Sequence, residues 1–290
     1  MSEGLRHAIL GAGGIGGLLG TALAHAGREV VLVVRDPDHP TDLRLDSRVL
    51  GDLGAVVTIA TTLPPGFDVL WVTVKAQHLE QALPACPPAA VGAARVVPLL
   101  NGVEHLARLR AVYGPESVIA GTIQVESERL TPGHYRQLSP FLRVGLAGRG
   151  AEAIASELEA AGVTASVETD AATLLWRKLA VLASLALTTT ALEAPIGAVR
   201  AEPAWRERLL AVATEVCAVA AAEGAIVDPM ATRQFVLGVP DAMQSSMQKD
   251  RAAGRPLELD AIGGAVQRAG RRHGLSTPVV DQLVAEISAI

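Results

Sequence analysis

One lysine stands at the head of a markedly apolar stretch of the chain, where a charge is unexpected. Lys178 precedes Leu179 to Leu187, and seven of those nine residues are leucine or alanine. Apolar residues recur here at the spacing of one helix face, namely Leu175, Leu179, Leu182 and Ala186. A lysine at such a position usually extends its ammonium group into water. If it is held beside a ligand instead, the ammonium could donate a proton to an oxygen that gains charge.

A glycine-rich turn near the start of the chain is a second feature with chemical potential. His7 to Leu10 is short and mostly apolar, and Gly11-x-Gly13-x-x-Gly16 follows at once. The pattern predicts a helix from Gly14 to Ala26, closed by Gly27, and then a strand over Val30 to Val34. A strand, this turn and a helix in that order bind the diphosphate of a dinucleotide. We therefore predict cofactor contacts from Gly11, Gly13, Gly14, Ile15 and Gly16.

The residue that follows the second predicted strand indicates which dinucleotide is bound. NAD-binding folds usually place an acidic residue there, which holds the ribose hydroxyls. Here the residue is Arg35, and a guanidinium suits a 2′-phosphate. Asp36 comes next, so NAD stays open as the alternative, but the sequence favours NADP(H).

Two more predicted strands end in polar residues. Asp68 to Val74 is followed by Lys75, and Arg95 to Leu100 is followed by Asn101. Ligands of open α/β sheets bind beyond the carboxyl ends of the strands. Lys75 could also be a solvated strand end, and Asn101 could belong to an ordinary turn. Because both follow strands of the same predicted sheet, we expect them to contact the cofactor.

The order of predicted elements indicates two domains. Strands and helices alternate in the first part, as in a doubly wound parallel sheet, and short antiparallel strands are expected between Val118 and Gly145. From residue 169 onward helical patterns dominate, beginning with Asp170 to Ala191. We therefore predict an α/β Rossmann-type NADP-binding domain over residues 1–168, followed by an all-α domain over residues 169–290.

Composition excludes several other classes of protein. A net charge of −5 without long runs of one sign argues against nucleic-acid binding. The two cysteines, Cys86 and Cys217, and the seven histidines show no metal-ligand spacing, so no metal is expected. Few cysteines suit a reducing compartment, and we predict a cytoplasmic protein. The uncharged segment from Ala8 to Ala26 contains six glycines between Gly11 and Gly20, too many for a signal peptide, and no membrane association is expected.

Several short segments, in this order, resemble the ketopantoate reductase family. They are GAGGIGG at Gly11, VTVKAQ around Lys75, NGV at Asn101, WRKLAV around Lys178, SSMQKD around Ser246, ELDAIGG at Glu258 and HGLSTP near the end. Each segment is short, and the specificity lies in their combination and order across nearly the whole chain.

The resemblance implies an NADPH-dependent oxidoreductase that reduces 2-dehydropantoate (ketopantoate) to pantoate for pantothenate biosynthesis. It assigns Lys178 as the general acid, Glu258 as the carboxylate that binds the substrate hydroxyl, and Ser246 as a ligand of the substrate carboxylate. Asn101 and Lys75 would position the nicotinamide and the substrate. Two alternatives stay open, because Glu258 could be a solvated helix residue and Ser246 could cap a helix.

The chain departs from the family on the helix of the lysine. Members commonly carry asparagines four and eight residues after it, where this chain has Leu182 and Ala186. Both positions share the face of the lysine, so we expect a less polar substrate surface unless Ser184 and Thr188 to Thr190 compensate. The alternatives are therefore a less polar ketone or 2-oxo acid as substrate, or a non-catalytic dinucleotide-binding protein. A monomer and a homodimer fit the sequence equally well.

Overall fold

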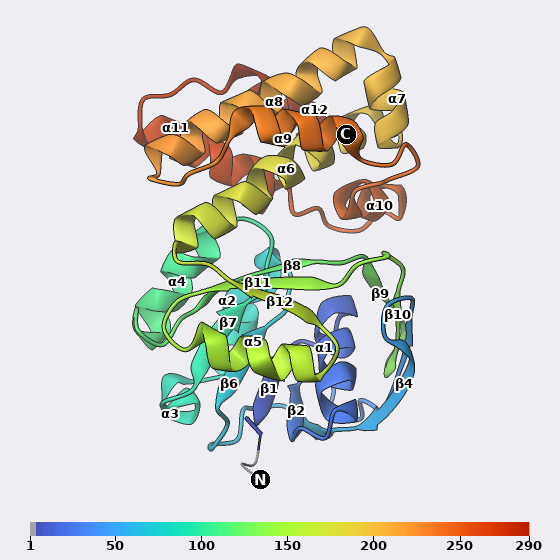
Figure 1. Ribbon diagram of the computed structural model, residues 1–290, viewed down its shortest axis with the longest axis vertical. Helices are drawn as coiled ribbons and strands as arrows, with labels where there is room; N and C mark the ends of the chain where they lie inside the picture. Colours follow the sequence, from blue (N-terminus) through green and yellow to red (C-terminus); the bar gives the residue numbers. More distant parts are fainter. Residues whose placement is uncertain (1–3, 290) are drawn as a thin grey trace. The chain divides into compact units, whose positions relative to one another are not determined.

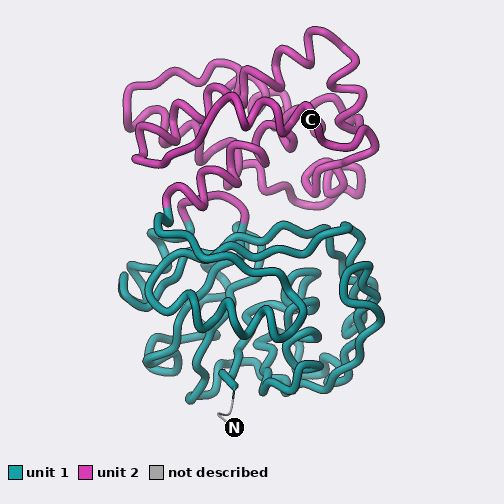
Figure 2. Tube along the Cα trace, in the orientation of Figure 1, with its two compact units in different colours: residues 1–100, 105–171 teal, residues 101–104, 172–290 magenta. Residues whose placement is uncertain are grey.

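The protein folds into two compact units. The structure is a computed structural model that describes residues 4–289. Unit 1 comprises residues 1–100 and 105–171, and unit 2 comprises residues 101–104 and 172–290 (Figure 2). The short segment 101–104 therefore belongs to unit 2, although the chain on both sides of it belongs to unit 1.

A five-stranded parallel sheet forms the centre of unit 1 (Figure 1). Its strand order is β5-β2-β1-β6-β7, with bounds Thr58–Ala60, Val30–Val33, His7–Leu10, Val69–Val72 and Arg95–Pro98. β1, β2 and β6 are buried along their whole length, as expected for apolar strands covered on both faces. Leu10 pairs with Val33 on one side and with Val72 on the other, so the three strands end level.

Helices cover this sheet and connect its strands. α1 (Gly14–His25) buries Leu18, Leu19 and Leu23 in the core of unit 1 and ends before Gly27, which has φ +82°. The other helical segments are η1 (Ala76–His78), α2 (Leu79–Ala82), η2 (Leu83–Ala85), α3 (Pro88–Val91), α4 (Glu104–Tyr113) and α5 (Ala151–Ala160). The observed order of strands and helices agrees with the predicted doubly wound arrangement.

Two smaller sheets complete unit 1. One has the order β4-β3-β10-β9, with bounds Gly51–Val56, Asp42–Ser47, His134–Gln137 and Ser127–Thr131. The other has the order β12-β11-β8, with bounds Thr164–Val167, Arg143–Ala147 and Ala120–Gln124. The antiparallel strands expected between residues 118 and 145 are present, as the pairs β9–β10 and β8–β11. The β3–β4 hairpin was not predicted, because most of β4 faces solvent and lacks an apolar alternation.

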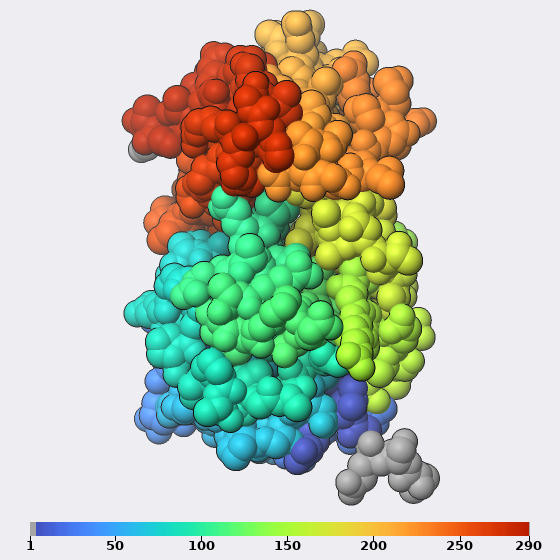
Figure 3. Space-filling view, turned by 90° about the vertical axis from the view of Figure 1, so that its left-hand side faces the viewer, coloured from blue at the N-terminus to red at the C-terminus, as the bar shows by residue number. Residues whose placement is uncertain are grey.

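Unit 2 is a bundle of helices around α6 (Ala171–Leu192), whose first residue still belongs to unit 1. The others are α7 (Ile196–Ala201), α8 (Pro203–Ala222), α9 (Pro229–Gly238), α10 (Ser246–Ala252), a π-helical turn η3 (Asp260–Gly264), α11 (Ala265–Arg272) and α12 (Pro278–Ser288). The residues after α6, gold to red in Figure 3, form a continuous surface of this unit.

α6 is long and apolar enough to cross a membrane, but its most apolar window is 67% buried inside the protein. Leu179, Ala183 and Leu187 of α6 belong to one buried apolar cluster with residues of α8 and α12 in the core of unit 2. The apolar stretch from Leu179 to Leu187 thus belongs to the helix at the centre of this unit's core.

Candidate functional site

The glycine turn after β1 has the geometry of a diphosphate-binding loop. Gly11 has φ +100°, and a Cβ on Gly16 would lie 1.9 Å from the carbonyl oxygen of Gly11. The Thr73 hydroxyl donates to that same carbonyl at 2.8 Å and fixes the turn from the neighbouring strand. Thr73 was not singled out in the sequence, although a hydroxyl residue at the end of a strand beside the turn was the available signal.

The start of α1 offers unoccupied space to an anion. Gly13 is the N-cap of α1 and provides no side-chain hydrogen bond to the helix, and a Cβ placed on it would have no neighbour within 4 Å. Amide N–H groups at such a helix start favour a negatively charged group. The turn therefore fits the diphosphate of a dinucleotide, and Gly14, Ile15 and Gly16 supply its first helical turn.

Arg35 and Lys75 lie at the carboxyl edge of the same sheet as the glycine turn. Arg35 is exposed and comes two residues after β2, while Lys75 is half-buried and comes three residues after β6. Asp36 accepts the backbone N–H of Asp38 through its Oδ1 at 3.0 Å. One oxygen of this carboxylate is thus engaged in a local turn, and the guanidinium of Arg35 suits a 2′-phosphate.

Lys178 lies on α6, where its surroundings make the protonated form of its side chain less favourable than in water. It is half-buried, and burial lowers the pKa of its ammonium group to about 8, while the negative charge of Glu258 acts in the opposite direction. The pKa of a lysine in water is near 10.4. An ammonium group with a pKa near neutral is easily deprotonated, which is the property required of a general acid.

Asn101 and Glu258 meet in the same unit as Lys178. Asn101 donates from Nδ2 to Oε2 of Glu258 at 2.9 Å, across 157 positions of sequence. Glu258 is only 8% exposed, so it is not the solvated residue considered as an alternative. Desolvating a carboxylate is costly unless polar groups accompany it, and the Asn101 amide is one such group. Lys178, Glu258 and Asn101 thus form one polar group in the helical unit.

Ser246 is the exposed first residue of α10, and its neighbour Ser245 is the cap of that helix. Ser245 accepts the N–H of Gln248 at 3.1 Å and shares a hydrogen bond of 2.9 Å with Thr189 of α6. The segment Ser-x-x-Gln is a capping-box pattern that could have located this cap in the sequence. Capping by Ser245 leaves the Ser246 hydroxyl available for another role.

The two positions at which the resemblance implies asparagines differ in their surroundings. Leu182 is half-buried, one helical turn from Lys178, whereas Ala186 is fully buried in the core of unit 2. The expectation that both side chains lie on the substrate surface is therefore wrong for Ala186, because that part of α6 is enclosed by other helices. The hydroxyls of Ser184 and Thr188 donate back to carbonyls of their own helix at 2.7 Å.

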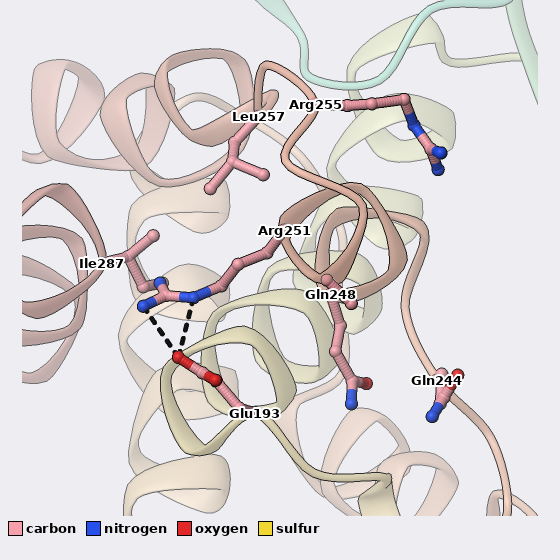
Figure 4. Close-up of a pocket in the computed structure, with 8 residues that line it drawn as sticks. Glu193, Gln244, Gln248, Arg251, Arg255, Leu257 and Ile287 are labelled. Carbon is pink, nitrogen blue, oxygen red and sulfur yellow. Dashed lines mark hydrogen bonds and ion pairs between the residues drawn. The ribbon is translucent and has the colours of Figure 1, made fainter. Parts of the chain in front are cut away.

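Unit 2 also contains a pocket of about 570 Å³ (Figure 4). It is lined by Glu193, Gln244, Gln248, Arg251, Ala252, Arg255, Leu257 and Ile287. Its arginines already have partners, since Arg251 donates to Glu193 at 3.0 Å and Arg255 to Asp250 at 2.8 Å. Lys178, Glu258 and Asn101 do not line it, so we do not assign the chemistry to this pocket.

Within residues 4–289, no group of three or more His, Cys, Asp or Glu side chains is arranged to hold a metal ion. Cys86 and Cys217 are both buried and unpaired, and burial raises the pKa of both thiols, to about 12 for Cys86. A thiol with a raised pKa is a poor nucleophile, so neither cysteine is a candidate for catalysis.

Comparison with known proteins extends this description to the whole chain. Residues 7–144 match the family described as ketopantoate reductase PanE/ApbA, and residues 170–290 match its C-terminal counterpart. A 2-dehydropantoate 2-reductase from Caulobacter vibrioides is 30% identical over 97% of this chain and 98% of its own. One from Mycobacterium tuberculosis is 31% identical over 97% of this chain and 96% of its own.

Solved structures agree with this relationship. The crystal structure of a PanE/ApbA family ketopantoate reductase from Ralstonia eutropha has a TM-score of 0.88 at 27% identity and covers 98% of each chain. A ternary structure of D-mandelate dehydrogenase with NADH, 24% identical with a TM-score of 0.86, shows the same fold. These comparisons confirm the predicted fold class, a Rossmann-type domain followed by a helical domain. The chain belongs to the ketopantoate reductase family and is an oxidoreductase that acts on a CH–OH/C=O pair.

Proposed function

We propose that the protein reduces a 2-oxo acid with NADPH, that 2-dehydropantoate is the leading substrate, and that Lys178 is the general acid. The observation that carries the proposal is the polar group of Lys178, Glu258 and Asn101 in unit 2, in which the charge of Glu258 acts on a lysine whose pKa is lowered to about 8.

In this proposal one part of the chain binds the cofactor and the other binds the substrate. Residues 1–168 bind NADP(H) through the glycine turn, with Arg35 at the 2′-phosphate and Lys75 and Asn101 beside the nicotinamide. Residues 169–290 carry the substrate site, to which the segment 101–104 contributes Asn101. When bound, NADPH supplies the hydride that reduces the carbonyl carbon.

Residues of the chain stabilise the charge that develops on the substrate and hold the substrate in place. As the C=O double bond is reduced to a single bond, the carbonyl oxygen gains negative charge, and the Nζ of Lys178 donates a proton to it. The neutral lysine then regains a proton from water. Glu258 accepts a hydrogen bond from a hydroxyl of the substrate, and Asn101 holds that carboxylate in place. Ser246 binds the carboxylate of the substrate.

A second candidate is a 2-oxo acid with an apolar flank. It is favoured by Leu182, an aliphatic side chain that remains partly exposed one helical turn from Lys178. The hydroxyls of Ser184 and Thr188 do not replace the missing amides, because both donate to carbonyls of their own helix. A polar substrate would therefore lose hydrogen bonds, each costing about 1 kcal/mol.

We infer a cytoplasmic enzyme of small-molecule metabolism, because both cysteines are free thiols, as is usual in a reducing compartment. A monomer and a homodimer both remain compatible with the chain.

Steady-state NADPH oxidation across a panel of 2-oxo acids tests the proposal. Lys178→Ala should lower kcat by about 10²–10⁴-fold, the contribution of a general acid. Arg206→Ala, which removes an exposed cation on α8, is the matched control and should leave kcat unchanged. Equal turnover by the Lys178→Ala variant would overturn the role of the lysine. No turnover of any 2-oxo acid by the wild type would favour a non-catalytic dinucleotide-binding protein.

A further inference from the structure

We infer that Arg268 is a positioning residue for the site, because it links the segment that carries Asn101 to the turn that follows Glu258. The inference rests on the proposed function, since it assumes that Asn101 and Glu258 bind the substrate. All of the residues involved belong to unit 2.

Arg268 binds Glu104, the last residue of the segment 101–104 that carries Asn101. Its Nε donates to Oε1 of Glu104 at 2.9 Å, and one terminal nitrogen donates to Oε2 of the same carboxylate at 2.7 Å. A two-point contact between a guanidinium and a carboxylate fixes direction as well as distance. Arg272 lies 4.0 Å from Glu104 and 2.9 Å from Glu223, so its main partner is elsewhere.

The same arginine holds the turn that follows Glu258. Its other terminal nitrogen donates to Oδ1 of Asp260 at 2.6 Å. Asp260, Gly264 and Arg268 are spaced four residues apart, and a Cβ on Gly264 would lie 2.6 Å from the Asp260 carboxylate and 3.0 Å from Arg268. Gly264 thus leaves the space in which this ion pair forms.

Between these two contacts the segment 101–104 lies directly against the π-helical turn. Gly102 has φ +87°, and a Cβ there would lie 2.4 Å from the carbonyl oxygen of Ala261. Val103 packs against the apolar core of unit 2. The backbone of Glu258 accepts the N–H of Ile262 at 3.1 Å, which joins it to the same turn. Asn101 and Glu258 thus lie on two segments whose backbones are in direct contact.

The exposure of the cluster argues for positioning rather than for stability. The side chains of Arg268, Glu104 and Asp260 are 35%, 40% and 85% exposed. Ion pairs with that access to water contribute little to the stability of a fold. Small displacements of groups that contact a substrate have much larger effects on rate. Residues that touch nothing reactive can in this way control an active site.

Kinetics of Arg268→Met should separate positioning from folding. We expect kcat/KM for the 2-oxo acid to fall about tenfold or more, while the Kd for NADPH and the Tm stay close to wild type. Arg268→Lys, which keeps one contact to Glu104, should recover part of the loss. Arg271→Met, an exposed arginine on the same helix, is the control and should match wild type.

Variants of the two carboxylates that bind Arg268 show which of its contacts matters more for activity. Glu104→Gln weakens the contact that reaches the Asn101 segment, whereas Asp260→Asn leaves Arg268 its hydrogen bond to the backbone carbonyl of residue 260, at 3.1 Å. We therefore expect a larger loss of kcat/KM from Glu104→Gln. If Glu258 moves, the Lys178 pKa falls, so the alkaline limb of the pH–rate profile should shift to lower pH in Arg268→Met and Glu104→Gln.

The outcomes distinguish this inference from the proposed function. Should Glu258→Gln be impaired while Arg268→Met and Glu104→Gln retain wild-type kcat/KM and pH profile, the positioning role is overturned and the proposed function survives. Equal losses of kcat/KM, NADPH affinity and Tm in Arg268→Met, with no recovery in Arg268→Lys, would identify a structural role instead. If Arg268→Met does not fold, Glu104→Gln and Arg268→Lys decide between these outcomes. Unimpaired activity of both Lys178→Ala and Glu258→Gln would overturn the proposed function itself.

Discussion

The glycine turn of unit 1 and the lysine site of unit 2 are built in opposite ways. The turn is made from residues 11–16 of one short segment, with Thr73 closing it from a neighbouring strand. The lysine site joins α6 to a carboxylate near the end of the chain and to an amide that lies 157 positions earlier. One site is local in sequence, and the other exists only after folding.

This difference has consequences for how each site fails. A local site depends on backbone conformation, so it should fail mainly through substitutions inside the turn itself. An assembled site depends on the packing of several elements, so residues that never touch the substrate can also disable it.

The first prediction concerns the charge beside Lys178. A general acid must be protonated, so activity should fall as the pH rises through about 8, the pKa of Lys178. The negative charge of Glu258 raises that pKa. Glu258→Gln should therefore move the alkaline limb to lower pH and reduce kcat/KM by about 100-fold, the value of a lost hydrogen bond to a charged group. Glu207→Gln, an exposed carboxylate on α8, is the control. If the alkaline limb of the pH–rate profile does not move, the charge of Glu258 does not raise the pKa of Lys178.

The same contrast explains what could be predicted from sequence in unit 1. The first strand and the start of the first helix were predicted at their observed residues, because apolar runs and glycines report backbone structure directly. The β3–β4 hairpin was missed, since its exposed strand lacks the apolar alternation that marks a half-buried strand.

The candidate site in unit 2 was less accessible to sequence reasoning. Periodicity placed Lys178 on a helix, but its pairing with Glu258 came only from resemblance to a family. Nothing in the sequence showed that Asn101 belongs to the helical unit, or that Ala186 is enclosed in the core. Contacts between distant segments depend on how helices pack, and local patterns do not encode that information.

The second prediction compares two glycines of the local site. A Cβ on Gly13 has open space, so Gly13→Ala should keep the wild-type Tm but raise the Kd for NADPH about tenfold, because the methyl group occupies the surface that approaches the diphosphate. A Cβ on Gly16 would overlap the Gly11 carbonyl, so Gly16→Ala should also destabilise the fold by about 1–3 kcal/mol. Fluorescence titration and thermal unfolding measure both effects, and equal Tm values would contradict the close packing.

The third prediction concerns the choice of dinucleotide. Arg35 is exposed at the edge of the sheet, while Asp36 is engaged with the backbone of Asp38. Arg35→Ala should lower the preference for NADPH over NADH about tenfold, by removing one charge-assisted contact to phosphate. The ratio of kcat/KM for the two cofactors measures it. Arg44→Ala, another exposed arginine of unit 1, is the control, and an equal change in both variants would exclude a specific contact.

The fourth prediction has the smallest expected effect and concerns the substrate. If an aliphatic surface near Lys178 limits turnover of ketopantoate, Leu182→Asn should raise kcat/KM several-fold, because one hydrogen bond contributes about 1 kcal/mol. The matched variant is Ala186→Asn, which places an amide in the enclosed core and should lower stability by about 1–3 kcal/mol without a gain in rate. A gain at position 182 alone would identify Leu182 as the side chain that faces the substrate. No gain with ketopantoate, together with a loss with a 2-oxo acid that has an apolar flank, would instead identify the leucine as an adaptation to that less polar substrate.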